Sequence, residues 1–441
     1  MIQRVGIFMS ITFLLSGLAG CDPVKHQSAT GLKKTTTRKM EFQSADSNQT
    51  DPFMINLLKE YPQFFDSVIK NKENLRIQII YTQIDRNKKG DVKLTDHYYN
   101  VNPGNYFYPA STVKFPIAVL ALQKLNELKI AGLDRNTTMI TETDYSGQTS
   151  VNNDPGSGDG RPTIAHYIKK ILLVSDNDAF NRLYEFLGQE YINNNLHRMG
   201  FSSAQIVHRL QISMSEDENR HTNPIHFFDT SGKLIYDQPA VNSKLIYAER
   251  NTRLGKGFYS GDQLIDEPFD FSGKNRLSLA DLHGILRSVM FPESVPPKQR
   301  FSLTQDDYTF LYRYMSMLPR ESKWPAYDSV NYWDTYVKFL FYGSEKRTAE
   351  PYIRIFNKVG DAYGFLIDAA YIVDYKNNIE FMLSAVIHCN SDGIFNDDKY
   401  DYDSTGFPFM KNLGQVIYNY ELKRQRKQTP GLSSMRLNYA E

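Results

Sequence analysis

The chain of 441 residues carries 51 basic and 50 acidic residues, which gives a net charge of +1. A balance this even lacks the basic footprint of nucleic-acid-binding proteins and argues against a polyanionic partner. Hydrophobic residues make up 41% of the chain, with 29 tyrosines and 27 phenylalanines, so one or two ordered domains with a large core are expected rather than a disordered protein.

The N-terminus has the pattern of a targeting segment. Arg4 supplies a positive charge, residues 5–15 are apolar, and Leu18-Ala19-Gly20 precedes Cys21. The apolar stretch is shorter than the roughly 20 residues that cross a bilayer. Small residues directly before a cysteine resemble the bacterial lipobox, which implies a signal peptide over residues 1–20 and lipidation of Cys21. We therefore expect a protein of the cell envelope, anchored by lipid to the non-cytoplasmic side of either the inner or the outer membrane.

Residues 21–52 are polar and lack an apolar period, so they are expected to form a flexible tether. A folded domain is expected over residues 53–425, followed by a C-terminal tail at 426–441. Cys389 is the only cysteine besides Cys21, so no internal disulfide is expected.

Hydrophobic periodicity predicts the elements of this domain in chain order. A first helix is expected at 53–61, a strand at 76–85 and a weaker strand at 93–100. Helices are then expected at 115–122, 163–172, 179–187, 278–290 and 306–317. Two strong strands, at 365–375 and 379–388, precede a final helix at 406–424. Residues 200–268 are the least regular part of the chain, and a hairpin is expected near 230–233. The sequence assigns no role to an insertion at 226–275.

Two loops carry patterns that also occur in ligand sites. The glycines at 156–160 lack the strand-loop-helix context of a phosphate-binding loop, so a turn is the preferred interpretation. The aspartate-rich stretch at 391–404 lacks the ligand spacing of a calcium loop, so a solvated loop is preferred. We expect no metal and no cofactor.

Ser111 and Lys114 stand three residues apart at the start of a long apolar run. If Ser111 begins a helix, Lys114 lies one turn later on the same face, within reach of the serine hydroxyl. An amine buried by the apolar run has a lowered pKa and can take the serine proton without a histidine. Pro116 removes a backbone donor early in this helix, a violation more expected at a functional site than in a scaffold. Taken alone, the pair has an alternative interpretation, in which Ser111 only caps a helix and Lys114 is exposed to solvent.

Two more short motifs follow, Ser175-Asp176-Asn177 and Lys358-Val359-Gly360. Taken separately, the first is typical of a turn between helices and the second of a strand start. In this order, with Ser111-Thr112-Val113-Lys114, they resemble the Ser-x-x-Lys, Ser-Asp-Asn and Lys-Thr-Gly set of class A β-lactamases and penicillin-binding proteins. The resemblance extends from about residue 53 to about residue 425, with an expanded section between the second and third motifs.

The resemblance implies a β-lactamase-like α+β fold. An antiparallel five-stranded sheet flanked by helices would come from both chain ends, about 53–115 and 351–425. An all-helical subdomain would come from about 116–350, and the site would lie where the two parts meet. We expect a monomer that acts on a β-lactam or a peptide-like small substrate.

The resemblance also assigns catalytic roles to four residues. Ser111 would be the nucleophile that forms an acyl-enzyme, and Lys114 would accept its proton. Ser175 would relay a proton to the leaving nitrogen, with Lys358 close by to ease that transfer.

Three further residues would bind the substrate. Asn177 would hold the substrate amide and help to fix Lys114. Gly360 and Asp361 lie on a strand edge, and the backbone N–H groups of Ser111 and Asp361 would form the oxyanion hole.

Two positions depart from the family pattern. Class A β-lactamases carry a glutamate, on the loop after the second motif, that activates the deacylating water, and the matching position here holds Gln211. A glutamine cannot accept a proton from water, so deacylation by that route would be slow unless Glu216 or Glu218 substitutes. Val359 replaces the hydroxyl residue of the third motif, and Asp361 adds a negative charge nearby. A substrate without the β-lactam carboxylate, such as a peptide, is therefore an alternative.

Three interpretations remain open. The first is an exported serine hydrolase, for which D-alanyl peptidase activity is a close rival to β-lactam hydrolysis. The second is a catalytically weak or inactive envelope protein that uses the same cleft to bind peptidoglycan peptides or a protein partner. The third is an unrelated lipoprotein in which the motifs coincide by chance.

Overall fold

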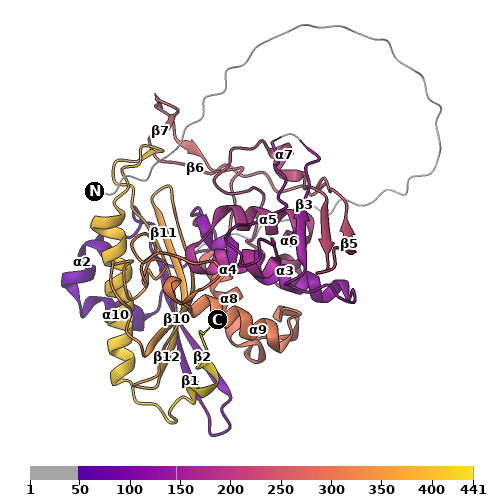
Figure 1. Cartoon of the computed structure of the whole chain (residues 1–441). Coiled ribbons are helices and arrows are strands. Elements are labelled where there is room, and N and C mark those ends of the chain that lie inside the picture. The colour runs from indigo at the N-terminus through magenta and orange to yellow at the C-terminus, as the bar shows by residue number, and fades with distance from the viewer. Residues whose placement is uncertain (1–47, 146, 441) are drawn as a thin grey trace. The chain divides into compact units, whose positions relative to one another are not determined.

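The computed structural model describes residues 48–145 and 147–440 (Figure 1). The predicted signal peptide, Cys21 and most of the expected tether lie outside these residues. The described chain contains a five-stranded antiparallel sheet in the order β10-β11-β12-β1-β2. Its strands are β1 (Gln78–Arg86), β2 (Val92–Tyr99), β10 (Ile353–Ala362), β11 (Phe365–Asp374) and β12 (Ile379–His388). The predicted α+β class, with a five-stranded sheet drawn from both ends of the domain, is confirmed.

Helices cover both faces of this sheet, and for that reason β11 and β12 are buried along their whole length. On one face α1 (Pro52–Lys59), α2 (Pro62–Lys70) and α10 (Phe407–Lys423) share one hydrophobic cluster with the irregular segment 336–342. On the other face α8 (Leu279–Met290) contacts β1, β11 and β12 (Figure 1).

The middle of the chain is mainly helical but not entirely so. Its helices are α3 (Lys114–Leu128), α4 (Ile164–Val174), α5 (Asn177–Leu187), α6 (Gln189–Arg198), α7 (Glu216–Arg220), α8 and α9 (Gln305–Ser316). A second sheet contains β3 (Thr138–Thr141), β4 (Ile225–Phe228) and β5 (Leu234–Gln238). The last two strands form the hairpin predicted near 230–233. Short strands are β6 (Arg253–Leu254), β7 (Gly257–Ser260), β8 (Gln263–Ile265), β9 (Phe269–Asp270) and β13 (Ile394–Phe395). The expectation of an all-helical middle section was therefore incomplete, because these strands are too short to give a periodic signal.

Single-turn helices complete the list of elements. They are η1 (Ala110–Val113), η2 (Pro292–Ser294), η3 (Pro297–Gln299), η4 (Pro319–Glu321), η5 (Tyr402–Gly406) and η6 (Leu432–Met435). Among residues 48–145 and 147–440, no helix combines the length and apolar character needed to cross a membrane.

The start of the chain's helical core differs from prediction in one respect. Ser111 lies in the 3₁₀ turn η1, and α3 begins only at Lys114. A 3₁₀ turn also places residues i and i+3 on one face, so the pairing of the two side chains survives. Pro116 falls in the first turn of α3, where backbone N–H groups have no intrahelical partner, so it breaks no rule there. The helix predicted at 53–61 is α1, which ends at Lys59, and a second helix that was not predicted, α2, begins at Pro62.

Both ends of the described chain pack onto the domain. Gln49 and Val101 exchange backbone hydrogen bonds of 2.7 and 2.9 Å, and the Asp51 carboxylate caps α1. Residues 48–51 of the expected tether are thus part of the folded chain. At the other end the Tyr439 hydroxyl lies 2.8 Å from Ser316 Oγ, and the Arg354 guanidinium lies 3.9 Å from the Tyr439 ring centroid. The predicted tail therefore contacts α9 and β10.

Candidate active site

The first motif forms the contact that its spacing predicts. Lys114 is fully buried, and its Nζ lies 2.8 Å from Ser111 Oγ. The same amine lies 2.6 Å from Asn177 Oδ1 and 2.5 Å from the backbone oxygen of Ser175. The apolar residues that follow Lys114 in α3 are buried on all sides, which explains why the amine is withdrawn from solvent.

The second motif is a tight turn between two helices, as its residue types predict. Ser175 ends α4 in the left-handed conformation, with φ 63°, which costs a residue other than glycine about 1–2 kcal/mol. Asp176 then caps α5 by accepting a 2.8 Å hydrogen bond from the Ala179 N–H. The turn directs Ser175 and Asn177 toward Lys114, so the turn and the site are the same structure.

The third motif brings a second buried amine to this turn. Lys358 lies on β10, is 3% exposed, and donates a 2.8 Å hydrogen bond from Nζ to Ser175 Oγ. Lys114 Nζ lies 3.3 Å from the same hydroxyl on its other side. One connected chain of polar groups therefore joins Ser111, Lys114, Ser175 and Lys358. Its first and last members are 247 positions apart in the sequence.

Burial controls the charge of both amines. It lowers the pKa of Lys114 to about 7, although the negative charges of Asp176 and Asp361 oppose the shift. Burial also lowers the pKa of Lys358 well below its usual range, and the nearby Lys114 lowers it further. Lys114 therefore carries a substantial neutral fraction near pH 7, and simultaneous protonation of both amines is disfavoured.

Gly360 lets the edge strand β10 lie against the turn that carries Ser111. A Cβ at this position would lie 2.9 Å from the Pro109 oxygen and 2.9 Å from the Ser111 nitrogen. The next residue, Asp361, is half-buried at the strand end. The backbone groups proposed for the oxyanion hole thus belong to two segments in close contact. Val359 is 2% exposed and packs in the hydrophobic cluster shared with α10, so its side chain adds no hydrogen-bond donor.

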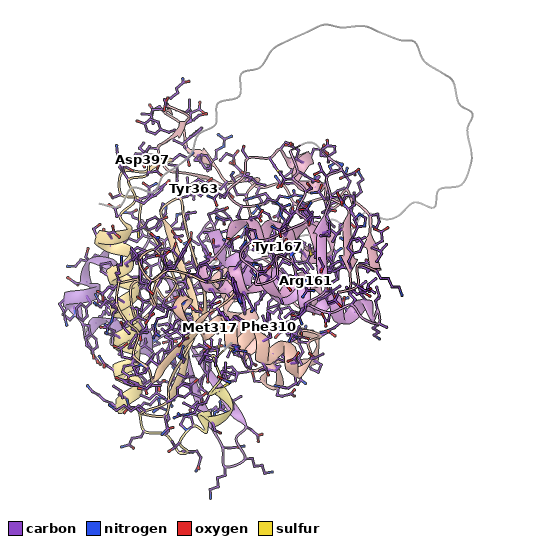
Figure 2. All side chains as sticks on the ribbon, viewed as in Figure 1. Arg161, Tyr167, Phe310, Met317, Tyr363 and Asp397 are labelled. Atoms are coloured by element: carbon purple, nitrogen blue, oxygen red, sulfur yellow. The ribbon has the colours of Figure 1, made fainter. Side chains whose placement is uncertain are left out.

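Aromatic side chains support the turn before Ser111. Tyr108 packs edge-on against Tyr363 with ring centroids 5.1 Å apart, and Phe271 lies 5.4 Å from Tyr363. Tyr363, labelled in Figure 2, directly follows β10. This cluster links the turn, the end of β10 and the segment before α8.

Gln211 lies at the site, whereas the two alternative glutamates bond elsewhere. Gln211 is exposed, with φ 63°, and its Oε1 accepts a 2.6 Å hydrogen bond from Asn177 Nδ2. Glu216 forms an ion pair of 2.7 Å with Arg220. Glu218 accepts a hydrogen bond of 2.8 Å from the Ser215 N–H at the start of α7. Of the three residues considered for deacylation, only Gln211 has a hydrogen bond to a motif residue.

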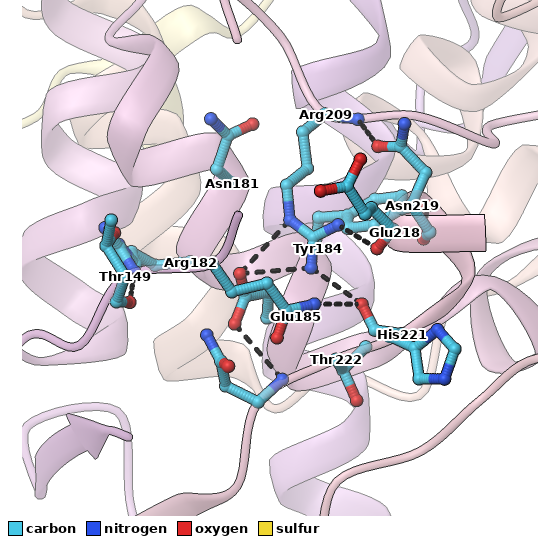
Figure 3. Close-up of polar contacts among 12 residues, drawn as sticks. Thr149, Asn181, Arg182, Tyr184, Glu185, Arg209, Glu218, Asn219, His221 and Thr222 are labelled. Carbon is cyan, nitrogen blue, oxygen red and sulfur yellow. Dashed lines mark hydrogen bonds and ion pairs between the residues drawn. The ribbon is translucent and has the colours of Figure 1, made fainter. Parts of the chain in front are cut away.

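A buried ion pair holds the loop that carries Gln211 (Figure 3). Arg209 is 2% exposed and lies 3.1 Å from the Glu185 carboxylate of α5. Its other nitrogens donate to the backbone oxygens of Glu218 and His221, at 3.1 and 2.8 Å. The loop is therefore fixed from its inner side, with Gln211 on its exposed side.

Replacing Arg209 with methionine should lower the free energy of unfolding by about 3–5 kcal/mol, because Glu185 would be left as a buried charge without its partner. Urea denaturation checks this value. Arg161→Met is the matched control, since Arg161 and Asp159 form an ion pair whose side chains are 37% and 54% exposed, and exposed pairs contribute at most about 1 kcal/mol. An equal effect of both substitutions would contradict the prediction.

A buried polar cluster behind Lys358 was not predicted. Lys338 Nζ donates to Asn357 Oδ1 at 2.6 Å, and Asn357 Nδ2 donates to Asp368 at 2.9 Å. Asn357 immediately precedes Lys358, so strand alternation places the two side chains on opposite faces of β10. Burial lowers the pKa of Lys338 to about 7 and raises the pKa of Asp368 to about 6. The available signal was Asp368 itself, the only charged residue in the apolar run 365–373.

Comparisons with known proteins agree with the motif assignment over part of the chain. The model of the Beta-lactamase enzyme family matches residues 63–245, which include the first two motifs but not the third. A search of curated proteins gives no match.

Solved β-lactamase structures are similar at low sequence identity. One from Sphaerobacter thermophilus DSM 20745 is 12% identical, with coverage of 83% of this chain and 97% of that chain and a TM-score of 0.43. One from Xanthomonas campestris pv. campestris is 12% identical, with coverage of 82% and 98% and a TM-score of 0.46. A class A β-lactamase from Clostridium kluyveri DSM 555 is 16% identical, with coverage of 81% and 98% and a TM-score of 0.45. Over residues 63–245 the chain thus matches the β-lactamase enzyme family.

Proposed function

We propose that the protein is a serine hydrolase, similar to class A β-lactamases, that cleaves an amide through an acyl-enzyme on Ser111. One observation carries this proposal: the buried amine of Lys114 lies 2.8 Å from Ser111 Oγ, and burial lowers the pKa of Lys114 to about 7. A neutral amine at that distance can accept the hydroxyl proton as the serine attacks.

Acylation uses the connected polar groups in sequence. Lys114 takes the proton of Ser111 while the serine oxygen bonds to the substrate carbonyl carbon. The carbonyl oxygen gains negative charge, which the N–H groups of Ser111 and Asp361 would stabilise. The C–N bond then breaks as Ser175 gives its proton to the leaving nitrogen and takes a proton from Lys114, whose Nζ lies 3.3 Å from Ser175 Oγ. Lys358, 2.8 Å from the same hydroxyl, lowers the cost of this transfer.

Deacylation lacks a comparable base. A water that attacks the acyl-enzyme must lose a proton, and the amide of Gln211 cannot accept it. We therefore propose that acylation is fast and deacylation slow, so that a β-lactam is trapped rather than efficiently destroyed. The same balance suits a D-alanyl peptidase acting on wall-type peptides.

A specific observation favours the second candidate function, a protein that binds such peptides without turnover. Gln211 stands where the family has the glutamate that activates the deacylating water, and Val359 stands where it has a hydroxyl residue that helps to hold the carboxylate of a β-lactam. The intact chain from Ser111 to Lys358 favours catalysis over binding alone.

Mass spectrometry of the intact protein after exposure to a penicillin and to an acyl-D-Ala-D-Ala peptide tests the proposal. We expect a covalent adduct with the penicillin in the wild type and none in Ser111→Ala. Nitrocefin hydrolysis then distinguishes turnover from trapping. A folded wild type that reacts with neither compound would contradict the hydrolase proposal and support the binding function.

We also propose that the protein is exported and anchored to a membrane by a lipid on Cys21, as the lipobox pattern suggests. Metabolic labelling with a fatty acid tests this anchor, because a Cys21→Ala variant should lose the label.

A further inference from the structure

We propose that a surface cavity beside α4, called here the Trp324 cavity, binds an N-acetylated amino sugar. The cavity has a volume of about 390 Å³, and its lining includes Asn136, Asp159, Arg161 and Trp324. This volume falls in the range of small-molecule sites. Neither the three motifs nor Gln211 contributes to the lining, so the cavity is distinct from the proposed active site.

The indole of Trp324 is the first feature of the Trp324 cavity. Trp324 is 45% exposed, yet its backbone oxygen accepts a 3.2 Å hydrogen bond from the Lys169 amine of α4. Gly158 lies directly against the ring, since a Cβ at that position would be 3.1 Å from both Cδ1 and Nε1 of the indole and 3.2 Å from Cδ2. The ring is thus held in place while much of it stays exposed, and a ligand with an apolar face would cover it.

The rest of the lining is polar. Apart from Trp324, Ala165 and Gly158, every described residue that lines the Trp324 cavity has a polar side chain. A sugar ring has the matching combination, because its C–H groups form an apolar face and its hydroxyl groups lie around its edge. A purely aromatic ligand lacks that polar edge, so the lining favours a sugar.

An ion pair on the rim matches an acetamido group. Arg161, labelled in Figure 2, lies 2.7 Å from the Asp159 carboxylate, and the two side chains are 37% and 54% exposed. Within residues 48–145 and 147–440, Arg161 Nη2 forms no hydrogen bond, and Asp159 Oδ2 accepts one from Arg161 Nε alone. An acetamido group can therefore accept from Arg161 and donate to Asp159. Because the two charges neutralise each other, the pair favours this neutral group over an ion.

Asn136 adds another amide at the same rim. Its backbone N–H donates to Asp134 Oδ1 at 2.7 Å, and its backbone oxygen accepts from Arg161 Nη1 at 3.5 Å. Its exposed side-chain amide has no hydrogen bond in the described part of the chain and can both donate to and accept from hydroxyl groups. The Trp324 cavity therefore offers partners for the acetamido group, the hydroxyls and the apolar face of one sugar.

NMR of the intact protein with N,N′-diacetylchitobiose, a disaccharide of N-acetylglucosamine, tests the proposal. The chain has two tryptophans, so a nitrogen–proton correlation spectrum contains two indole signals. We expect the disaccharide to shift the Trp324 signal and to leave the Trp333 signal in place, because Trp333 does not line the cavity. Cellobiose, which has hydroxyls in place of the acetamido groups, should bind at least about tenfold more weakly, because it loses hydrogen bonds to charged partners.

Three variants locate the binding, with saturation-transfer NMR on the acetyl methyl signals of the disaccharide as the measurement. Trp324→Ala should abolish binding, and Arg161→Gln should reduce it to the level of cellobiose. Trp333→Phe is the matched control and should bind as the wild type does. An unmoved Trp324 indole signal, equal binding of the two disaccharides, or unchanged binding in a folded Trp324→Ala variant would overturn the proposal.

Ser111→Ala separates this site from the proposed catalytic one. It removes the proposed nucleophile and should bind the disaccharide as the wild type does, so failure of the hydrolase proposal leaves the sugar site intact. Loss of binding in Ser111→Ala would place the sugar in the proposed active site and would also overturn the Trp324 assignment.

Discussion

Replacing Gln211 with glutamate is expected to shorten the lifetime of a penicilloyl adduct on Ser111 by about 10²–10⁴-fold, the usual contribution of a general base. Glutamate has nearly the same shape as glutamine, so it can keep the 2.6 Å hydrogen bond from Asn177 Nδ2. Its carboxylate, unlike the amide, can take a proton from an attacking water. The measurement is the decay of the adduct mass after free penicillin is removed, together with nitrocefin turnover.

Two variants make this result specific to position 211. Ser213→Glu places a carboxylate two residues away on the same exposed loop and should leave the adduct lifetime unchanged. Gln211→Ala should leave it long as well, because it adds no base. An unchanged lifetime in Gln211→Glu, with acylation intact, would show that the loop does not position a water for attack.

The second large effect is expected at Lys114. Lys114→Met removes the base but keeps an unbranched side chain of similar length, and should slow acylation by about 10²–10⁴-fold. In the wild type the rate of adduct formation should rise with pH and level off above about pH 7, because burial lowers the pKa of Lys114 to about 7 and only the neutral amine accepts a proton. Stopped-flow mixing with a chromogenic cephalosporin gives both quantities.

Lys129→Ala is the control for charge on the same helix, since Lys129 is exposed at the end of α3. It should retain the rate and the pH profile of the wild type. A rate that is independent of pH between 5 and 9 in the wild type, or a Lys114→Met variant that acylates normally, would exclude Lys114 as the proton acceptor.

The sheet and the contact between Ser111 and Lys114 were predictable because their signals are local. Residues 365–373 and 379–388 are nearly continuous apolar runs, which is the pattern of strands buried on both faces. Ser111 and Lys114 were predicted to meet because they stand three positions apart, a spacing that places both side chains on one face of a helix. The contact between Ser175 and Lys358 could be predicted only from the order of the three motifs, since nothing in the local sequence indicates that the two side chains touch.

The residues that sequence analysis missed depend on contacts between distant segments. Glu185 pairs with Arg209 across 24 positions, and Lys338 reaches Asn357 across 19. The residues next to Glu185 and Lys338 in the sequence do not distinguish either of them from an exposed charged residue on a helix or a turn. Segment 336–342 likewise gave no periodic pattern, although Leu340 is fully buried against the sheet, because its backbone follows irregular turns.

The geometry around Lys114 has a consequence for the direction of proton transfer. A neutral amine has two hydrogens and a single lone pair. The two shortest contacts of its nitrogen, 2.5 Å to the Ser175 backbone oxygen and 2.6 Å to Asn177 Oδ1, are with carbonyl oxygens that can only accept. Both hydrogens are therefore committed to these oxygens, and the tetrahedral nitrogen is left with its lone pair facing Ser111. The turn between α4 and α5 thus sets the orientation of the base before any substrate arrives.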